Sequence, residues 1–170
     1  MSREQKIVAT GAASGIIVML VALFGLWTLA PHLSVEADAG ERLAFAAQWI
    51  AIAAAPLFLA IVSVGNERFM SDAIDPTAGK ESRAMVINGR VVDNTVQQYA
   101  LFVVASLAVA AGARGDQLGI IAAAALIFLV MRFAFWIGYR IDPLYRAFGM
   151  SATAYLNLAL FVAAVWMGVR

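Results

Sequence analysis

Three polar residues recur at helical spacing in an otherwise apolar part of the chain. Arg90, Asn94 and Gln97 stand at positions i, i+4 and i+7, so they share one face of a helix. Asp93 adds a carboxylate beside this stripe. A guanidinium and two amides on one face are suited to binding carboxylates and peptide groups. The stripe therefore indicates a site for a small anionic ligand.

A second set of polar residues closes the next apolar stretch. Arg132 and Tyr139 lie seven residues apart, which places them on one helix face about 10 Å from each other. Arg140, Tyr145 and Arg146 follow just before the last apolar stretch begins. The amides at the start of that helix also favour an anion. Together the two sets predict a cationic, hydrogen-bonding pocket near one membrane surface.

Structural roles are the alternative for part of this set. Arg140 and Tyr145 have the positions of interfacial anchors. An ion pair of Asp93 with Arg90 or Arg132 would serve the fold alone. The deeper polar residues of both stripes still require partners inside the bundle, which favours a binding role for them.

Composition places the chain in a membrane. Of its 170 residues, 63% are hydrophobic and 14% are charged, whereas a soluble domain is about half apolar and a quarter charged. A net charge of +1 does not indicate a protein that binds nucleic acid. The absence of cysteine excludes disulfides, cysteine nucleophiles and thiolate metal sites. His32 is the single histidine, so no metal site is expected.

The apolar residues fall into five stretches long enough to cross a bilayer. The first is longer than the apolar region of a signal peptide, so we interpret it as a retained helix. Its small residues Gly11 and Gly15, four apart, allow close helix packing. Pro56 predicts a kink in the second stretch. The five stretches are Ile7–Ala30, Leu43–Gly65, Met85–Ala113, Leu118–Tyr139 and Met150–Val169.

The distribution of basic residues predicts the orientation. With five spans, one side holds eight basic residues and the other holds three, and the basic side is expected to be cytoplasmic. We therefore expect a cytoplasmic N-terminus and an external C-terminus. The eight are Arg3, Lys6, Arg68, Lys80, Arg83, Arg90, Arg140 and Arg146, and the three are Arg42, Arg114 and Arg170.

Three motifs together resemble a known family. They are R-x3-N-T-V-x-Q at 90–98, R-F-A-F-W-I-G-Y at 132–139 and D-P-x-x-R-x-x-G at 142–149. This combination is similar to the MAPEG family, the membrane-associated proteins in eicosanoid and glutathione metabolism, which includes microsomal glutathione transferases. The resemblance implies an all-α integral membrane bundle: a four-helix core, as in bacterial members, at residues 43–170, with residues 1–42 adding an extra N-terminal transmembrane helix and loop.

The resemblance also implies a ligand and an assembly. It predicts glutathione as cofactor, no metal, and a homotrimer among membrane lipids. Ile7–Ala30 would be available to contact a membrane-protein partner. The family pattern predicts that glutathione is held by five residues and that Arg146 is catalytic, since it would stabilise the glutathione thiolate. The five are Arg90, Asn94, Gln97, Arg132 and Tyr139.

The chain departs from the family pattern at three site positions. Gln97 stands where glutathione-using members usually carry Glu, so the site lacks that negative charge. Asp93 stands where some members carry Arg, and Phe135 where some carry His. Two functions follow as hypotheses. One is a glutathione-dependent transferase or peroxidase acting on lipophilic electrophiles, and the other is a non-catalytic membrane subunit with a structural, regulatory or lipid-binding role.

Overall fold

The protein is a bundle of long helices. A computed structural model describes residues 1–169, and the regular elements in that range are all helical. This confirms the predicted all-α membrane bundle. Its elements are α1 (Arg3–Trp27), α2 (Ala39–Ala53), α3 (Ala55–Phe69), α4 (Arg83–Gly112), the 3₁₀ turn η1 (Gly115–Gln117), α5 (Gly119–Ile141) and α6 (Ala147–Gly168).

Over the described residues, five helical segments are long and apolar enough to cross a membrane. Four of them are α1, α4, α5 with η1, and α6, and the fifth is formed by α2 and α3 together over Ala39–Phe69. The helix is interrupted at Ala54, just before Pro56 in the first turn of α3. Proline lacks an amide hydrogen and clashes with the preceding turn, which explains the kink expected there.

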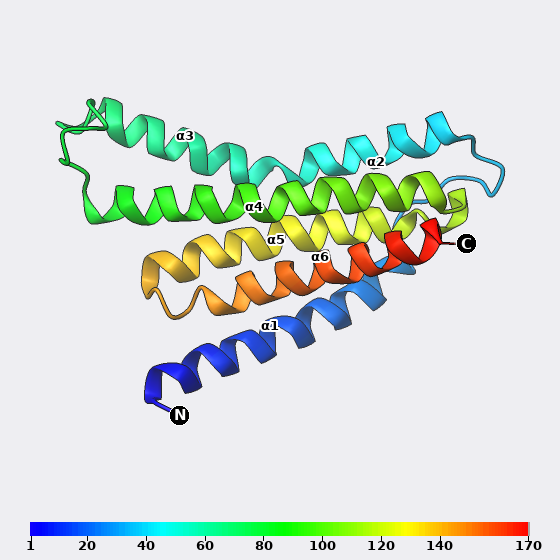
Figure 1. The fold of residues 1–170 in the computed structure, drawn as a ribbon, viewed down its shortest axis with the longest axis horizontal. Coiled ribbons are helices and arrows are strands. Elements are labelled where there is room, and N and C mark those ends of the chain that lie inside the picture. Colours follow the sequence, from blue (N-terminus) through cyan, green and yellow to red (C-terminus); the bar gives the residue numbers. More distant parts are fainter. Residues whose placement is uncertain (170) are drawn as a thin grey trace.

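Helix α5 forms the centre of the bundle. It packs against α1, α2, α4 and α6, and Figure 1 shows it between α4 and α6. The small residues Ala122, Ala123, Ala124 and Ala125 are fully buried, which lets the neighbouring helices approach it closely. A central helix of this kind can fix a polar side chain with little freedom to move.

The loops gather at the two ends of the bundle. The N-terminus, the 70–82 connection and the 142–146 connection lie at one end, and the remaining loops and the end of α6 lie at the other (Figure 1). The first of these ends, called the basic end below, carries the eight basic residues that predict a cytoplasmic face. Arg170, which was counted for the opposite side, lies outside the described residues.

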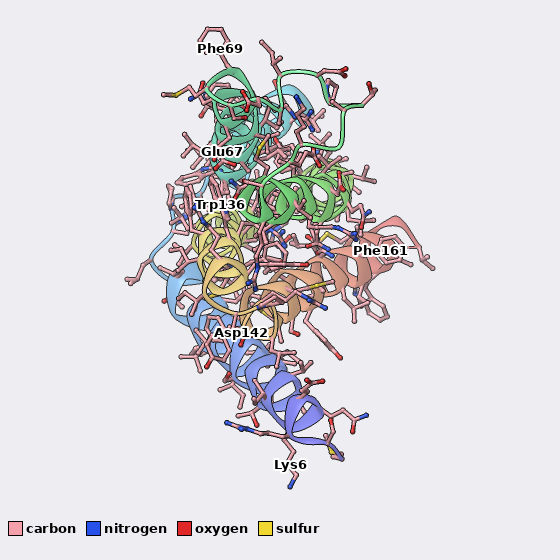
Figure 2. All side chains as sticks on the ribbon, turned by 90° about the vertical axis from the view of Figure 1, so that its left-hand side faces the viewer. Lys6, Glu67, Phe69, Trp136, Asp142 and Phe161 are labelled. Carbon is pink, nitrogen blue, oxygen red and sulfur yellow. The ribbon has the colours of Figure 1, made fainter. Side chains whose placement is uncertain are left out.

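Helix α1 lies at the edge of the bundle, against α6. Figure 2 places Lys6 of α1 and Phe69 of α3 at opposite extremes of the molecule. A Cβ atom added at Gly15 would lie 2.1 Å from the carbonyl oxygen of Phe148, and one at Gly11 would lie 3.4 Å from the Cβ of Ala147. The expected close packing through small residues is thus made with the first turn of α6.

We expect Gly15→Leu to displace α1 from α6, because the backbone of Phe148 leaves no room for a side chain. Overpacking of this kind costs about 1–3 kcal/mol. The measurement is the thermal midpoint of the detergent-purified protein. Gly25→Leu is the matched control, since nothing lies within 4 Å of a Cβ there. Equal midpoints for the two variants would contradict the packing.

Candidate functional site

Most of the predicted site residues line one cavity at the basic end of the bundle. It has a volume of about 350 Å³ and lies between α4, the end of α5 and the start of α6. Five of the six predicted residues are on its wall, and the structure adds Asp93, Phe135 and Met150. The full lining is Arg90, Asp93, Asn94, Gln97, Phe135, Tyr139, Arg146 and Met150.

Helix α4 supplies the polar wall of this cavity. The helix starts at Arg83 after Ser82, whose hydroxyl accepts a hydrogen bond from the Met85 amide. It then runs without interruption to Gly112, so the spacing of the stripe is preserved in the fold. Arg90, Asp93 and Gln97 are exposed on this wall. These side chains can therefore meet a ligand directly.

The sixth predicted residue, Arg132, lies behind the wall and does not line the cavity. Its side chain is only 1% exposed. Its guanidinium donates to the Thr95 hydroxyl at 2.7 Å, to the side-chain oxygen Oδ1 of Asn94 at 3.0 Å and to the Thr153 hydroxyl at 3.3 Å. Its guanidinium also lies 4.0 Å from the centre of the Phe135 ring. Arg132 thus joins α4, α5 and α6 at the back of the cavity.

The buried guanidinium has no carboxylate partner. Between residues 1 and 169 the ion pairs are Arg68–Glu81 and Arg114–Asp116, so the structural pairing of Asp93 with Arg90 or Arg132 is not formed. The Nε of Arg132 is also buried without a hydrogen-bond acceptor. A buried charge is costly unless compensated. The positive potential behind the cavity is therefore available to attract an anion into it.

Arg132 also sets the direction of the Asn94 amide. The Asn94 Oδ1 accepts from Arg132, and its Nδ2 lies 3.9 Å from the sulfur of Met150, a cavity residue. The guanidinium holds the oxygen and one N–H can donate to the sulfur, so the second N–H of the amide is left for a ligand. Asn94 therefore presents a hydrogen-bond donor to the cavity.

Arg146 and Tyr139 form the opposite side of the cavity. Arg146 is the N-cap residue of α6. Its Nη1 donates to the carbonyl of Pro143 at 3.1 Å, and its guanidinium lies 5.3 Å from the centre of the Tyr139 ring. One guanidinium edge is thus anchored, and the side chain is held at the mouth of the cavity together with the positive end of α6.

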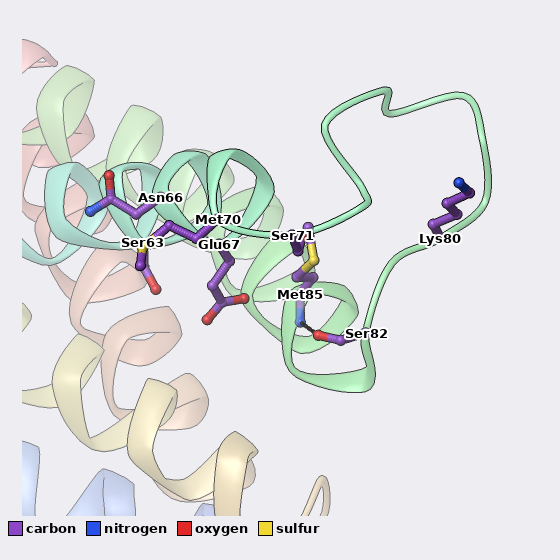
Figure 3. Close-up of a pocket in the computed structure, with 8 residues that line it drawn as sticks. All are labelled: Ser63, Asn66, Glu67, Met70, Ser71, Lys80, Ser82 and Met85. Atoms are coloured by element: carbon purple, nitrogen blue, oxygen red, sulfur yellow. Dashed lines mark hydrogen bonds between the residues drawn. The ribbon is translucent and has the colours of Figure 1, made fainter.

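A larger cavity of about 430 Å³ lies near the same end of the bundle, between α3, the start of α4 and the 70–82 connection (Figure 3). A buried network stands beside it. The Asn88 amide nitrogen donates to Glu67 at 2.8 Å, and the Asn88 oxygen accepts from the Trp136 indole at 2.8 Å. Figure 2 shows Glu67 and Trp136 on neighbouring helices. This network ties α3, α4 and α5 together.

We expect Asn88→Leu to destabilise the bundle, because it leaves Trp136 and Glu67 without their buried partner. Each unsatisfied buried group costs about 1–3 kcal/mol. The thermal midpoint measures the loss. Asn66→Leu, at an exposed position of the same cavity, makes the same chemical change outside the network. A loss of similar size in that control would show that the network is not the cause.

A separate apolar groove lies on α4 and α6, farther from the basic end than the candidate cavity. Its volume is about 410 Å³. It is lined by side chains of α4 and α6 further into the membrane-spanning part, namely Leu101, Val104, Ala154, Asn157, Leu158 and Phe161. This groove could not be predicted from the sequence, since apolar residues at helical spacing are equally expected in a lipid-facing surface.

The comparisons with known proteins agree with the motifs. The MAPEG family pattern matches residues 46–166, from the middle of α2 to the last turn of α6, and does not include α1. No curated protein and no solved structure matches the chain. The match includes every residue that lines the candidate cavity. The chain therefore belongs to the MAPEG family, an integral membrane family related to glutathione and eicosanoid metabolism.

Proposed function

We propose that this protein is a membrane transferase or peroxidase that uses glutathione against lipophilic electrophiles. The observation that carries the proposal is the meeting of Arg90, Asn94, Gln97, Tyr139 and Arg146 around one polar cavity. A separate apolar groove lies farther along two of the helices that line this cavity, α4 and α6. An anionic cofactor would bind in the polar cavity, and a lipid-soluble substrate would bind in the apolar groove.

The cavity wall supplies groups for an anionic peptide. Arg90 would bind a carboxylate of glutathione, and the Asn94 amide nitrogen would donate to a peptide or carboxylate oxygen. Arg132 would act through Asn94 and through its positive potential, since its own side chain is buried. Affinity in the millimolar range corresponds to only about 4 kcal/mol, which a few such contacts can provide.

Arg146 would stabilise the reactive form of glutathione. A thiol attacks as its thiolate, and a guanidinium beside it favours ionisation. The thiol proton would leave to water at the basic end of the bundle. The thiolate would form a carbon–sulfur bond with an electrophile in the apolar groove, and the leaving group would depart with the electron pair of the broken bond. The groove would bind the apolar part of this substrate.

A difference spectrum tests the proposal. Adding glutathione to the purified protein should produce the ultraviolet absorption of a thiolate at neutral pH, and turnover should follow with a lipophilic aryl halide or lipid hydroperoxide. If no thiolate forms at any glutathione concentration, the transferase proposal is wrong.

Assembly and location complete the proposal. We place the protein in a bacterial inner membrane with the basic end in the cytoplasm, where glutathione is present. In Figure 1 the start of α1 and the end of α6 lie at opposite ends of the bundle, which supports opposite sides for them. We further propose a homotrimer surrounded by lipid, with α1 free on its outer face to contact a membrane-protein partner. Cross-linking in native membranes tests both the copy number and the partner.

A non-catalytic subunit is the second candidate. The observation that favours it is Gln97, a neutral residue on the cavity wall where glutathione-using members usually carry Glu. On this hypothesis the scaffold is kept and glutathione does not bind. If glutathione does not bind to the wild-type protein but binds to the Gln97→Glu variant, the result would support this candidate over the enzyme.

A further inference from the structure

Asp93 is an unpaired carboxylate within a membrane-spanning helix. It lies on the wall of the candidate cavity, about one-third of the way along α4. In the described part of the chain it has no ion pair, and no hydrogen bond to its side chain is formed. Ionisable groups inside membrane spans are costly and are normally matched by a partner or a ligand. Asp93 is exposed on the cavity wall, so its carboxylate is free to accept from a group that binds in the cavity.

The surrounding charges define what that partner can be. Arg90 and Arg146 share the cavity wall with Asp93, and Arg132 lies behind it. Neither Arg90 nor Arg146 lies within ion-pair distance of Asp93, so the cavity holds separated charges of both signs. Guanidinium groups outnumber the carboxylate, so a matching ligand carries more negative groups than positive ones and has at least one cationic group.

We propose that Asp93 is the acceptor for the ligand's ammonium group and so selects a ligand with a free amino-acid end. This inference rests on the proposed function, in which glutathione is the ligand. Asp93 and Gln97 are four residues apart on one face, about 6 Å along the helix. The carboxylate missing at position 97 is thus replaced one turn nearer the basic end, and the ammonium binds there.

The test is a thermodynamic cycle in which the carboxylate is removed from the protein, the ammonium is removed from the ligand, or both are removed. Binding of glutathione and of N-acetylglutathione, which lacks the ammonium, is measured by calorimetry on wild-type protein and on Asp93→Asn. We expect acetylation to weaken binding to wild type about tenfold or more, since a charge-assisted hydrogen bond is lost. In Asp93→Asn acetylation should have little effect.

Two further variants sharpen the cycle. Asp93→Asn combined with Gln97→Glu restores a carboxylate one turn away and should restore discrimination against the acetylated ligand. Asp72→Asn, in the exposed 70–82 connection, removes the same charge outside the cavity and should leave the discrimination unchanged.

The outcomes separate this inference from the proposed function. Equal weakening by acetylation in wild type and Asp93→Asn would overturn the role of Asp93 while glutathione binding stands. Dissociation of the oligomer in Asp93→Asn, with discrimination retained, would assign the carboxylate to a contact between copies of the chain. Coupling between Asp93 and the ammonium of glutathione itself, with no thiolate absorption in the difference spectrum at any glutathione concentration, would uphold Asp93 and overturn the transferase. No binding of glutathione would overturn both.

Discussion

Arg146→Ala should lower kcat/KM for conjugation by about 10² to 10³, the effect of removing one charge-stabilising donor at a reacting atom. The structural reason is the position of Arg146, which caps α6 at the cavity mouth and is held by Pro143 and Tyr139. Without the guanidinium, the glutathione thiol should ionise only near its ordinary pKa of about 8.5. The rate should then rise with pH where the wild type has already levelled off.

Two other variants separate the effect of the Arg146 charge from a nonspecific effect of substitution near the same membrane surface. Arg146→Lys keeps the charge but loses the planar fork, so an intermediate rate is expected. Arg140→Ala removes an exposed cation near the same membrane surface that does not line the cavity, and it should leave turnover unchanged. Wild-type turnover and an unchanged pH profile in Arg146→Ala would remove this residue from the reaction.

Arg132→Met should weaken glutathione binding at least tenfold while leaving the thermal midpoint unchanged or higher. Replacing a buried charge that has no carboxylate partner with an apolar side chain removes a desolvation cost. The hydroxyls it leaves remain satisfied, because Thr95 donates to the Val91 carbonyl and Thr153 to the Gly149 carbonyl. Binding suffers because Asn94 loses the group that orients it, and the cavity loses the positive potential behind it.

Calorimetric titration and a melting curve on the same preparation check this prediction. A variant that melts much earlier would make Arg132 a structural residue, and an unchanged affinity would show that neither its charge nor its hold on Asn94 matters. Asn94→Ala provides the comparison, since it removes the oriented amide and keeps the guanidinium. If Arg132 acts through Asn94, the two losses in affinity should be less than additive in the double variant.

Helical spacing was enough to predict which α4 residues share a face, because the helix runs without interruption from Arg83 to Gly112. The five spans could be predicted because each apolar stretch is long enough to cross a bilayer as a helix. A kink in the second span was expected from Pro56 alone, since its ring and missing amide hydrogen act locally, and the structure places the interruption at Ala54.

Residue position within a helix could not give burial depth. Arg132 and Tyr139 share a face of α5, yet Arg132 is enclosed by Thr95 and Thr153 while Tyr139 lines the cavity. That difference depends on how α4 and α6 cross α5. At Gly149, an added Cβ would lie 2.4 Å from the Met131 carbonyl oxygen, so α6 comes very close to α5 beside Arg132. Such a contact between distant segments has no signature in the spacing of either helix.

The docking of α1 was likewise only half predictable. Gly11 and Gly15 indicated a close helix neighbour, and the structure identifies it as the first turn of α6. This turn directly follows Arg146, so α1 supports the helix start that holds the proposed catalytic guanidinium.

Calorimetric titration of the detergent-purified wild-type protein with glutathione, beside Arg90→Ala and Gln97→Glu, tests the central claim most directly. We predict millimolar or tighter binding to wild type, at least tenfold weaker binding to Arg90→Ala and tighter binding to Gln97→Glu. Absence of binding to wild type at millimolar glutathione would contradict the claim. Binding that appears only in Gln97→Glu would identify a MAPEG scaffold whose glutathione site has been lost.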